Sequence, residues 1–416
     1  MGNTCIVIGG GIIGLSSAYY LHKAGFQVKV IDKSAMDRGA SYVNAGYLTP
    51  SHIVPLAAPG MISKGIKWMF DSSSPFYIKP RLDWDFMKWT WYFKKASTTS
   101  HVQRSLKVIK DINILSRDMY DDILASGDLD AYQYERQGLL MVFKSAKAGD
   151  EERKVASWAG DLGLEVKELN KAELSAMQPD SNIDALGAFY YLCDGHMTPG
   201  QFMARMKDYL QKSGIEIITN KEVIDFNFEH GKVKALVTND GSLEADEFVL
   251  ASGCWSENLA KKLGIYLPVQ AGKGYRIDVP RPTGITLPTI LMESKVAVTP
   301  MDGFTRFAGT MELSGINNII RKERVEAIAN AAHRYYPSFE VNAEEKAQAQ
   351  FGFRPVSPDG LPYIGKTSKY TNLTFASGHA MMGWSLGPGT GKLVTEIITG
   401  EKTSMDLKAF GVERYM

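Results

Sequence analysis

The sequence predicts an α/β protein in which a discontinuous, Rossmann-like nucleotide-binding domain is combined with a second domain that has a sheet of its own. Three observations lead to this fold class. The chain opens on a strand, a glycine turn, a helix and a second strand. Buried-strand patterns that end on glycine return in the middle of the chain and near its C-terminus. Two long insertions separate these pieces, one rich in helix patterns and one rich in strand patterns.

The first piece is a nucleotide-binding unit. Residues 5–8 form a short apolar run, as a buried parallel strand requires. Gly9, Gly11 and Gly14 follow in the spacing G-x-G-x-x-G, and residues 15–24 predict a helix. Gly9 permits the tight turn out of the strand, Gly11 lets a pyrophosphate approach the backbone, and Gly14 lets the helix pack close to the strand.

A second strand over residues 26–32 closes this unit and ends on Asp32. Its carboxylate is placed to accept hydrogen bonds from both ribose hydroxyls of a dinucleotide, which argues against NADP. The helix start that follows the glycines favours phosphate charge. The pattern predicts a dinucleotide site and leaves NAD and FAD open; the alternative is a tight strand–helix turn without a ligand.

Composition excludes several classes of function. The 416 residues carry a formal net charge of +1, so no nucleic-acid-binding surface is indicated. Cys5, Cys193 and Cys254 are scattered, so we expect neither a metal site nor a disulfide framework. There is no secretory signal pattern and no apolar run long enough to span a membrane. We therefore expect a cytoplasmic protein.

The order of the patterns predicts the domain boundaries. The first insertion is mainly helical, as in "SLKVIKDINILSRDMYDDILAS", and the second has strands followed by a helix from Arg321. The expected ranges are 1–49, 180–266 and 346–416 for the nucleotide-binding domain, and 50–179 and 267–345 for a substrate domain.

The glycine-rich C-terminal stretch "FASGHAMMGWSLGPGTGKLVTEIITG" favours FAD. We expect a helix to begin at residues 390–392 and to point its N-terminus at the nucleotide unit. A reduced flavin carries negative charge that a helix N-terminus stabilises, whereas a reduced nicotinamide has lost its charge. The alternative is a turn with packing duties only. Because no cysteine falls beside the expected flavin ring, we expect FAD to bind non-covalently, although Cys254 lies near the pyrophosphate side.

Arg354 lies in "GFRPVSPDGLPYIG", between two cofactor segments. The proline that follows makes its backbone extended, and we expect it in a polar turn. A guanidinium there can hold a carboxylate by two parallel hydrogen bonds. A surface salt bridge is the alternative, and the residue pattern alone leaves both open.

Over its whole length the chain resembles the FAD-dependent D-amino-acid oxidase superfamily, and most of all the bacterial D-amino-acid dehydrogenases. The stretches that carry the resemblance are "GGGIIG", "NAGYLTP", "AAPG", "IKWMF", "KGY", "GFRPVSPDGLP" and "GHAMMGWSLGPGTGKL". The resemblance implies FAD between the two domains and Arg354 as the clamp for the substrate carboxylate. It further implies that the segment beside the pyrophosphate and flavin holds Ser41, Asn44, Ala45 and Gly46. The remaining expected cofactor contacts are Ile12, Ile13, Lys33, Val223, Ser252, Gly253, Gly378, His379, Met382, Gly383, Trp384, Gly389 and Thr390.

The expected reaction is dehydrogenation of a small D-amino acid. Arg354 would hold the carboxylate and so place the Cα–H bond against flavin N5 for hydride transfer. The product imine would hydrolyse to a keto acid and ammonia. Tyr275 and His52 are candidates for orienting or deprotonating the amine. The alternatives are a packing aromatic for Tyr275 and a structural histidine for His52.

Two departures from the family pattern leave the substrate open. "SHIVP" puts His52 where the dehydrogenases often carry Pro-Gly-Tyr, and "AMM" at 380–382 is bulkier than usual. A cis-4-hydroxy-D-proline or D-proline dehydrogenase is therefore an alternative, followed by a sarcosine- or glycine-type oxidase. A dinucleotide-binding sensor without chemistry is the alternative outside the enzymes, and Arg354 argues against it.

Residues 60–97 hold four of the seven tryptophans, interleaved with six lysines. Tryptophan favours the lipid–water interface and lysine favours anionic headgroups. This segment therefore predicts a peripheral contact with the inner face of a membrane, where a quinone could accept the electrons. The alternative is a helical insertion that buries its tryptophans against the substrate domain.

Overall fold

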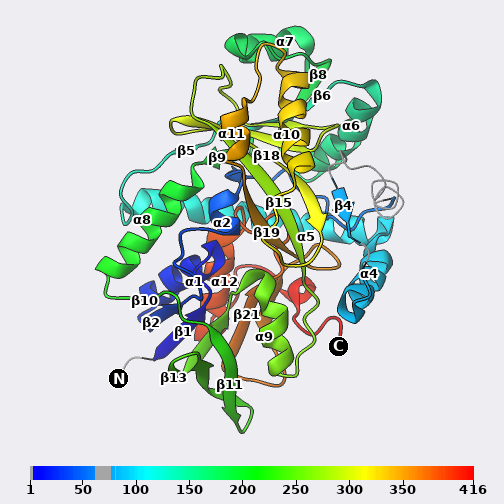
Figure 1. Ribbon diagram of the computed structural model, residues 1–416. Coiled ribbons are helices and arrows are strands. Elements are labelled where there is room, and N and C mark those ends of the chain that lie inside the picture. Colours follow the sequence, from blue (N-terminus) through cyan, green and yellow to red (C-terminus); the bar gives the residue numbers. More distant parts are fainter. Residues whose placement is uncertain (1–2, 61–75, 80) are drawn as a thin grey trace.

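The computed structural model describes residues 3–60, 76–79 and 81–416. Two sheets dominate it. A six-stranded sheet lies in the lower half of Figure 1, and a nine-stranded sheet lies in the upper half. Both halves are assembled from distant parts of the chain, as the sequence predicts.

The six-stranded sheet joins the N-terminal, middle and C-terminal pieces. Its order is β10-β2-β1-β14-β21-β20, and all pairs are parallel except the antiparallel edge pair β21–β20. The strands are β1 (Thr4–Ile8), β2 (Gln27–Ile31), β10 (Glu216–Ile218), β14 (Glu247–Leu250), β20 (Tyr363–Lys366) and β21 (Leu373–Ser377). The continuous burial of β1 and β14 shows that this sheet is covered on both faces, which parallel sheets require.

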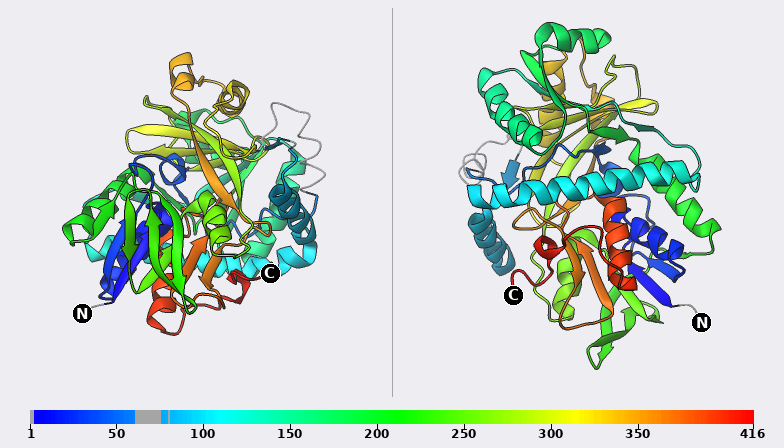
Figure 2. Two further views of the ribbon diagram at one scale, coloured as in Figure 1. Left: turned by 60° about the horizontal axis from the view of Figure 1, so that its bottom comes forward. Right: turned by 180° about the vertical axis from the view of Figure 1, so that it is seen from behind.

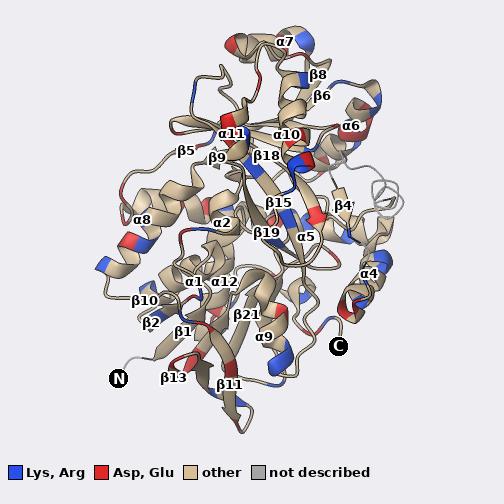
Figure 3. Ribbon diagram, in the orientation of Figure 1, with Lys and Arg blue, Asp and Glu red and all other residues tan. Residues whose placement is uncertain are grey.

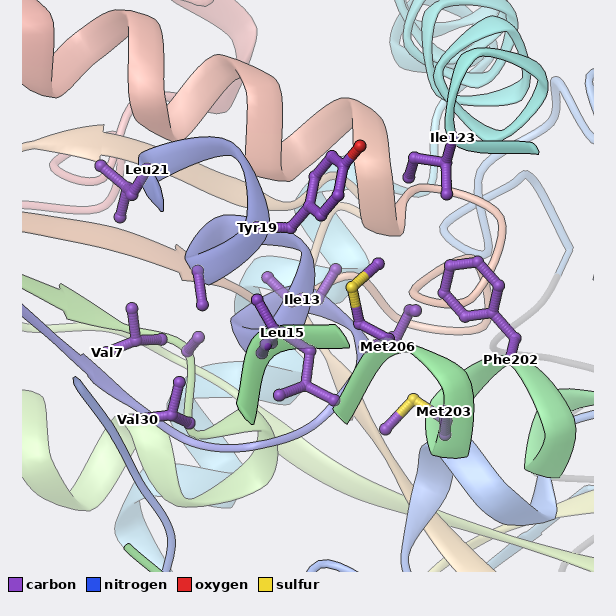
Figure 4. Close-up of a cluster of buried hydrophobic side chains, with 14 of the residues drawn as sticks. Val7, Ile13, Leu15, Tyr19, Leu21, Val30, Ile123, Phe202, Met203 and Met206 are labelled. Carbon is purple, nitrogen blue, oxygen red and sulfur yellow. The ribbon is translucent and has the colours of Figure 1, made fainter. Parts of the chain in front are cut away.

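Alternate residues of β1 face the two covering layers. Cys5 and Val7 pack with the helical layer, whereas Ile6 and Ile8 pack with a small antiparallel sheet. The helical layer contains α1 (Ile12–Lys23), α8 (Pro199–Lys212), α12 (Gly387–Thr399) and α5 (Thr99–Ser126). The small sheet contains β11 (Val223–Glu229), β12 (Lys232–Thr238) and β13 (Gly241–Glu244). Figure 4 shows the first of these clusters, with Val7 and Val30 facing Leu15 and Met206.

The long helix α5 crosses the back of the molecule, as the right-hand view of Figure 2 shows. It packs against α12 so closely that a Cβ at Gly389 would lie 2.7 Å from Ser116 Cβ. Gly391 has the same relation to Ser16 of α1. These glycines therefore allow α12 to pack closely against both α5 and α1.

The nine-stranded sheet has the order β19-β15-β18-β17-β16-β6-β8-β7, with β4 beside β18. Its strands are β4 (Phe76–Ile78), β6 (Leu139–Phe143), β7 (Val166–Asn170), β8 (Gly187–Tyr191), β15 (Gln270–Val279), β16 (Thr289–Leu291), β17 (Val296–Met301), β18 (Phe304–Leu313) and β19 (Gln350–Val356). Helix α10 (Lys322–Tyr335) covers one face with an apolar core. The opposite face is turned toward the six-stranded sheet.

Shorter elements complete the fold. A three-stranded sheet consists of β3 (Tyr47–Leu48), β9 (Gly195–Met197) and β5 (Tyr134–Glu135). The other helices are α2 (Ala40–Val43), α4 (Trp84–Ala96), α6 (Ala146–Asp161), α7 (Lys171–Met177), α9 (Ser256–Lys262) and α11 (Ala343–Ala347), with short 3₁₀ turns at Pro179–Ser181, Gly253–Trp255 and Lys408–Phe410. Among the described residues, no helix is long and apolar enough to cross a membrane.

The structure differs from the sequence-based expectation in several elements. Helix α1 begins at Ile12 and α12 at Gly387, both three residues before the expected starts, and Pro388 occupies the first turn of α12. Arg354 lies in strand β19, whereas a polar turn was expected. The first insertion holds strands as well as helices.

Two strands lie in ranges that were expected to belong to the nucleotide-binding domain but pair in the sheet of the other domain. The range 180–266 includes β8, and 346–416 includes β19, yet both strands pair within the nine-stranded sheet. Strand β19 belongs to the nine-stranded sheet because it pairs with β15 along its whole length, from Gln270 to Arg276 of β15.

Candidate active site

A cavity of about 1770 Å³ lies between the two sheets. Residues that follow β1, β14 and β21 line it, including Gly9, Ser252 and His379. Ligands of open α/β sheets bind at this carboxyl edge. The other wall comes from the nine-stranded sheet and from residues 52–58. Both domains therefore contribute to one site.

The glycine turn leaves room for a phosphate group. Gly9 has φ +111°, and a Cβ there would lie 2.5 Å from the carbonyl oxygen of Ala251. A Cβ at Gly14 would collide with the carbonyl oxygen of Gly9, so Gly14 sets the close approach of α1 to β1. At Gly11 a Cβ would meet only Ser41 Oγ, at 3.3 Å, so this position faces open space. The cradle fits a pyrophosphate.

Asp32 lines the same part of the cavity and also fixes the turn. Its Oδ2 accepts a hydrogen bond from the Gly10 N–H at 2.7 Å, and its Oδ1 accepts from the backbone and hydroxyl of Ser34. Carboxylate oxygens have further lone pairs. Asp32 can therefore hold the turn and still accept a ribose hydroxyl.

The loop from Gly39 to Gly46 closes the cavity near the start of α1. Ser41 Oγ accepts from the Ile12 N–H at 2.9 Å, which satisfies one free donor of the first helical turn. The loop continues through Asn44 and Ala45, which line the cavity.

The nine-stranded sheet holds this loop through Arg306. Its Nη1 donates to the carbonyl oxygens of Tyr42 and Asn44, at 3.0 and 2.7 Å, while its Nε pairs with Asp278 Oδ1 at 2.8 Å. Burial lowers the pKa of Arg306 to about 9. Arg306 is therefore a positioning residue whose hydrogen-bonding groups are committed to the loop and to Asp278.

The segment before α12 forms the floor of the cavity. His379, Met382, Gly383 and Trp384 all line it. His379 Nε2 lies 3.0 Å from Thr390 Oγ1, and burial lowers the pKa of this histidine to about 3, so its ring is neutral at pH 7. Because α1 and α12 both begin next to lining residues, two helix N-termini give this region a potential that favours negative charge.

Arg354 is the cation of the cavity wall contributed by β19. The basic residues of β15 and β19 lie near the centre of the molecule in Figure 3. Arg354 Nη1 donates to the carbonyl oxygen of Thr310 at 2.8 Å. Burial lowers the pKa of Arg354 to about 10. Among the described residues, no carboxylate forms an ion pair with it, so its guanidinium keeps donors for a ligand.

Gly274 makes room for this guanidinium. A Cβ at that position would collide with the Nη atoms of Arg354. The other two arginines on this face, Arg276 and Arg306, both pair with Asp278. Arg354 is thus the one of these three that is left for an incoming carboxylate.

His52 lies on the segment 52–58, which lines the cavity together with the nine-stranded sheet. His52, Val54, Leu56 and Ala58 line the cavity, while Ile53 between them is fully buried. Burial, and to a smaller extent the nearby Lys295, lowers the pKa of His52 to about 4. Its imidazole is therefore neutral at pH 7.

Tyr275 also borders the cavity, but its hydroxyl donates to Glu312 Oε2 at 2.8 Å. Its ring packs with Ile277 and Val279 in the core beneath α10. The donor of this phenol is used inside the protein.

Most of the sequence-predicted site residues meet at this cavity. Besides Arg354, Tyr275 and His52, the lining includes Gly9, Gly11, Ile12, Ile13, Asp32, Lys33, Ser41, Asn44, Ala45, Val223, Ser252, Gly253, His379, Met382, Gly383 and Trp384. The residues that lie behind the lining are Gly14, Gly46, Gly378, Gly389 and Thr390. The residues behind the lining have two kinds of role. Gly389 allows α12 to pack against α5, and Thr390 lies within hydrogen-bond distance of the lining residue His379.

Sequence reasoning missed several lining residues, among them Met141, Ile290, Thr310 and Gly274. The first two look like ordinary strand residues, and nothing in the sequence indicates which face of a strand meets a ligand. Among the described residues, no group of three or more His, Cys, Asp and Glu side chains could hold a metal ion.

The chain is similar to known proteins over nearly its whole length. D-amino acid dehydrogenase from Vibrio vulnificus (strain CMCP6) is 33% identical over 407 residues, which cover 96% of each chain. D-amino acid dehydrogenase from Helicobacter pylori (strain J99) is 30% identical and 94% of each chain is covered. The crystal structure of glycine oxidase from Geobacillus kaustophilus matches over 100% of both chains with a TM-score of 0.79 at 22% identity, which shows a shared fold.

The family model described as FAD dependent oxidoreductase (DAO) matches residues 4–397, nearly the entire chain. The cavity volume, the glycine cradle and the two helix N-termini fit FAD as the cofactor. This chain therefore belongs to the DAO family of FAD-dependent oxidoreductases.

Proposed function

We propose that this protein oxidises D-amino acids by FAD-dependent dehydrogenation, with Arg354 holding the substrate carboxylate. The observation that carries the proposal is the guanidinium of Arg354, which lines the cavity, is enclosed by protein and has no carboxylate partner among the described residues. A buried cation is costly unless it is paired. A carboxylate that enters the cavity supplies the missing pair through charge-assisted hydrogen bonds.

FAD bound in this cavity supplies the acceptor for the hydride of the substrate. The chain's contribution is to hold the substrate in one orientation. Arg354 fixes the carboxylate, and the carbonyl oxygen of Thr310 fixes one end of the guanidinium. Because the bound substrate already has a fixed orientation, less orientational entropy is lost in reaching the transition state, and the activation barrier is lower.

The amine must react in its neutral form. The neutral imidazole of His52 puts no positive charge beside it, and it can accept a hydrogen bond from an N–H. We assign His52 an orienting role for this reason. Tyr275 remains a candidate for positioning, because its phenol donates to Glu312 and so holds the strand beside Arg354.

The cavity wall selects the substrate side chain. Val54, Leu56, Met141 and Ile290 give an apolar surface on this side. We therefore expect D-alanine and larger apolar D-amino acids to react.

An anaerobic flavin-reduction screen tests this function. The yellow protein is mixed without oxygen with D-alanine, D-methionine, D-lysine, D-proline, sarcosine and glycine, and the flavin absorbance is followed. We expect D-alanine and D-methionine to bleach it first. Bleaching by D-proline alone would favour the imino-acid alternative, and a protein that stays yellow with every amine would contradict the proposal.

We further propose that the reduced FAD passes its electrons to a membrane quinone. The protein would bind the membrane surface through α4. Trp84, Met87 and Trp91 form an exposed stripe on this helix, preceded by the fully exposed Leu82. Lys95 Nζ lies 3.6 Å from the ring centroid of Trp91. Exposed aromatic rings beside lysines are typical of a surface that binds anionic lipid.

Part of the tryptophan-rich segment has a different role. Trp89 is buried, and its Nε1 donates to the carbonyl oxygen of Val356 at 2.9 Å. This tryptophan supports the fold, so a membrane test must spare it. Trp68 and the neighbouring lysines Lys64 and Lys67 lie outside the described residues.

Vesicle sedimentation tests the membrane contact. We expect the protein to sediment with vesicles that contain phosphatidylglycerol, to dissociate in high salt, and to lose binding in Trp84→Ser/Trp91→Ser with FAD retained. Phe228→Ser, which changes an exposed aromatic on β11, is the matched control. A protein that stays in the supernatant at every salt concentration would rule out this surface.

A further inference from the structure

The strand pair that carries the substrate clamp is interrupted by a bulge. Lys273 of β15 pairs with Glu312 of β18, but Tyr275 pairs with Gly309. Two residues of β18, Thr310 and Met311, therefore stand opposite the single residue between them on β15. Bulges next to active sites redirect a side chain.

Thr310 has an unusual backbone conformation at this bulge. Its φ is +62°, which a β-branched residue rarely adopts. Such strain persists only where the surroundings enforce it, and it is concentrated at functional sites. In this conformation the carbonyl oxygen of Thr310 accepts from Arg354 Nη1 at 2.8 Å. The strained residue Thr310 is therefore hydrogen-bonded to Arg354, the proposed carboxylate clamp.

The side chain of Thr310 leaves one hydrogen-bonding group unused. Thr310 lines the cavity and is 7% exposed, and its Oγ1 has no hydrogen-bond partner among the described residues. Buried hydroxyl groups almost always have a partner. The hydroxyl and methyl groups of a threonine exchange places by rotation about χ1, so the donor can turn to a ligand without backbone movement.

We propose that Thr310 is a second substrate-contacting residue, whose hydroxyl donates a hydrogen bond to the carboxylate that Arg354 holds. The inference rests on the proposed function. A carboxylate has about four lone-pair sites, and a guanidinium in two parallel hydrogen bonds uses two of them. The hydroxyl beside the guanidinium supplies a third donor and fixes the rotation of the carboxylate, which the Cα–H direction follows.

Substitutions at this position separate the hydroxyl from the backbone. Thr310→Val removes the hydroxyl and keeps the shape, whereas Thr310→Ser keeps the hydroxyl. Thr310→Gly removes the hydroxyl and also accepts the positive φ without strain, so it tests the proposal even if the valine variant folds poorly. Thr305→Val is the matched control, because Thr305 is buried on the same strand, pairs with Thr283 and lies away from the cavity.

The probes are propionate, which has the carboxylate of D-alanine without the amine, and ethylamine, which has the amine without any carboxyl or carbonyl oxygen. Binding of propionate is measured by the change in flavin absorbance. We expect about a tenfold increase in Kd for propionate and in KM for D-alanine in Thr310→Val and Thr310→Gly. Thr310→Ser and Thr305→Val should match the wild type, and ethylamine should bind all the variants with the Kd of the wild type.

The outcomes distinguish this inference from the proposed function. If the wild type is bleached by D-alanine but both hydroxyl-free variants bind propionate like the wild type, Thr310 does not contact the carboxylate. If the binding of ethylamine is weakened as much as that of propionate, the effect comes from general distortion and the inference is wrong. A wild type that no D-amino acid bleaches would instead overturn the proposed function.

Discussion

Replacing Arg354 by lysine keeps the positive charge of the proposed carboxylate clamp but removes its planar guanidinium group. In the structure one end of the guanidinium is held by the Thr310 carbonyl oxygen, and the other donors face the cavity. Lysine offers a single ammonium for both tasks. We therefore expect Arg354→Lys to lose about one charge-assisted hydrogen bond to the substrate.

The size of the effect follows from this loss. One hydrogen bond to a charged group contributes roughly 1.5–3 kcal/mol, so KM should rise roughly ten- to a hundredfold. Arg354→Met should abolish carboxylate binding and at the same time stabilise the ligand-free protein. Burial lowers the pKa of Arg354 from 12.5 to about 10, so the charge costs up to about 3 kcal/mol in the folded state at every pH below 10.

Three measurements make the test decisive: KM and kcat for D-alanine, FAD content, and the free energy of unfolding. Arg281→Lys is the matched control, because the partly exposed Arg281 pairs with the buried Glu345 and does not line the cavity. Unchanged KM and kcat in Arg354→Lys, with FAD intact, would refute the assignment of the clamp. A less stable Arg354→Met protein would refute the claim that this charge is unpaired.

Three further predictions concern the cofactor and the core. Gly11→Val should fold but contain no FAD, because its Cβ meets only Ser41 Oγ at 3.3 Å while its methyl groups enter the phosphate space; normal flavin absorbance would remove this turn from the site. Acid precipitation should release all the yellow colour, since Cys254 beside the cavity is buried and burial raises the pKa of its thiol; colour in the pellet would mean a covalent bond. His196→Gln should lose less stability than the wild type between pH 7 and pH 5. Burial lowers the pKa of His196 to about 4, so on acidification the unfolded chain binds a proton at this residue before the folded protein does. This lowers the free energy of unfolding of the wild type by about 2 kcal/mol at pH 5. Equal losses in guanidinium denaturation would contradict this.

Local patterns made the nucleotide-binding half predictable. The spacing of Gly9, Gly11 and Gly14 has one physical solution, a turn between a buried strand and a closely packed helix, and the structure has it. The glycine-rich segment before α12 was also placed at the cavity. The glycine-rich stretch continues into α12, where Gly389 and Gly391 allow helices to pack and do not line the cavity.

The substrate half was less predictable because long-range pairing forms it. The family resemblance predicts Arg354 as the clamp, which stays a prediction, yet its strand, its contact with Thr310 and the space left by Gly274 depend on which strands lie beside β19. No local pattern encodes a bulge between β15 and β18. Likewise, the spacing of tryptophans in α4 does not show that Trp89 is buried while Trp84 is exposed.

The most direct test of the account is a single turnover with the two enantiomers of alanine. The FAD-loaded protein is mixed anaerobically with D-alanine or L-alanine, and both flavin bleaching and pyruvate are measured. The account predicts that D-alanine bleaches the flavin and yields one pyruvate per flavin, and that Arg354→Met does neither at the same concentration. Equal bleaching by L-alanine, or bleaching in Arg354→Met at the wild-type rate, would contradict a cavity in which this arginine orients a D-amino acid.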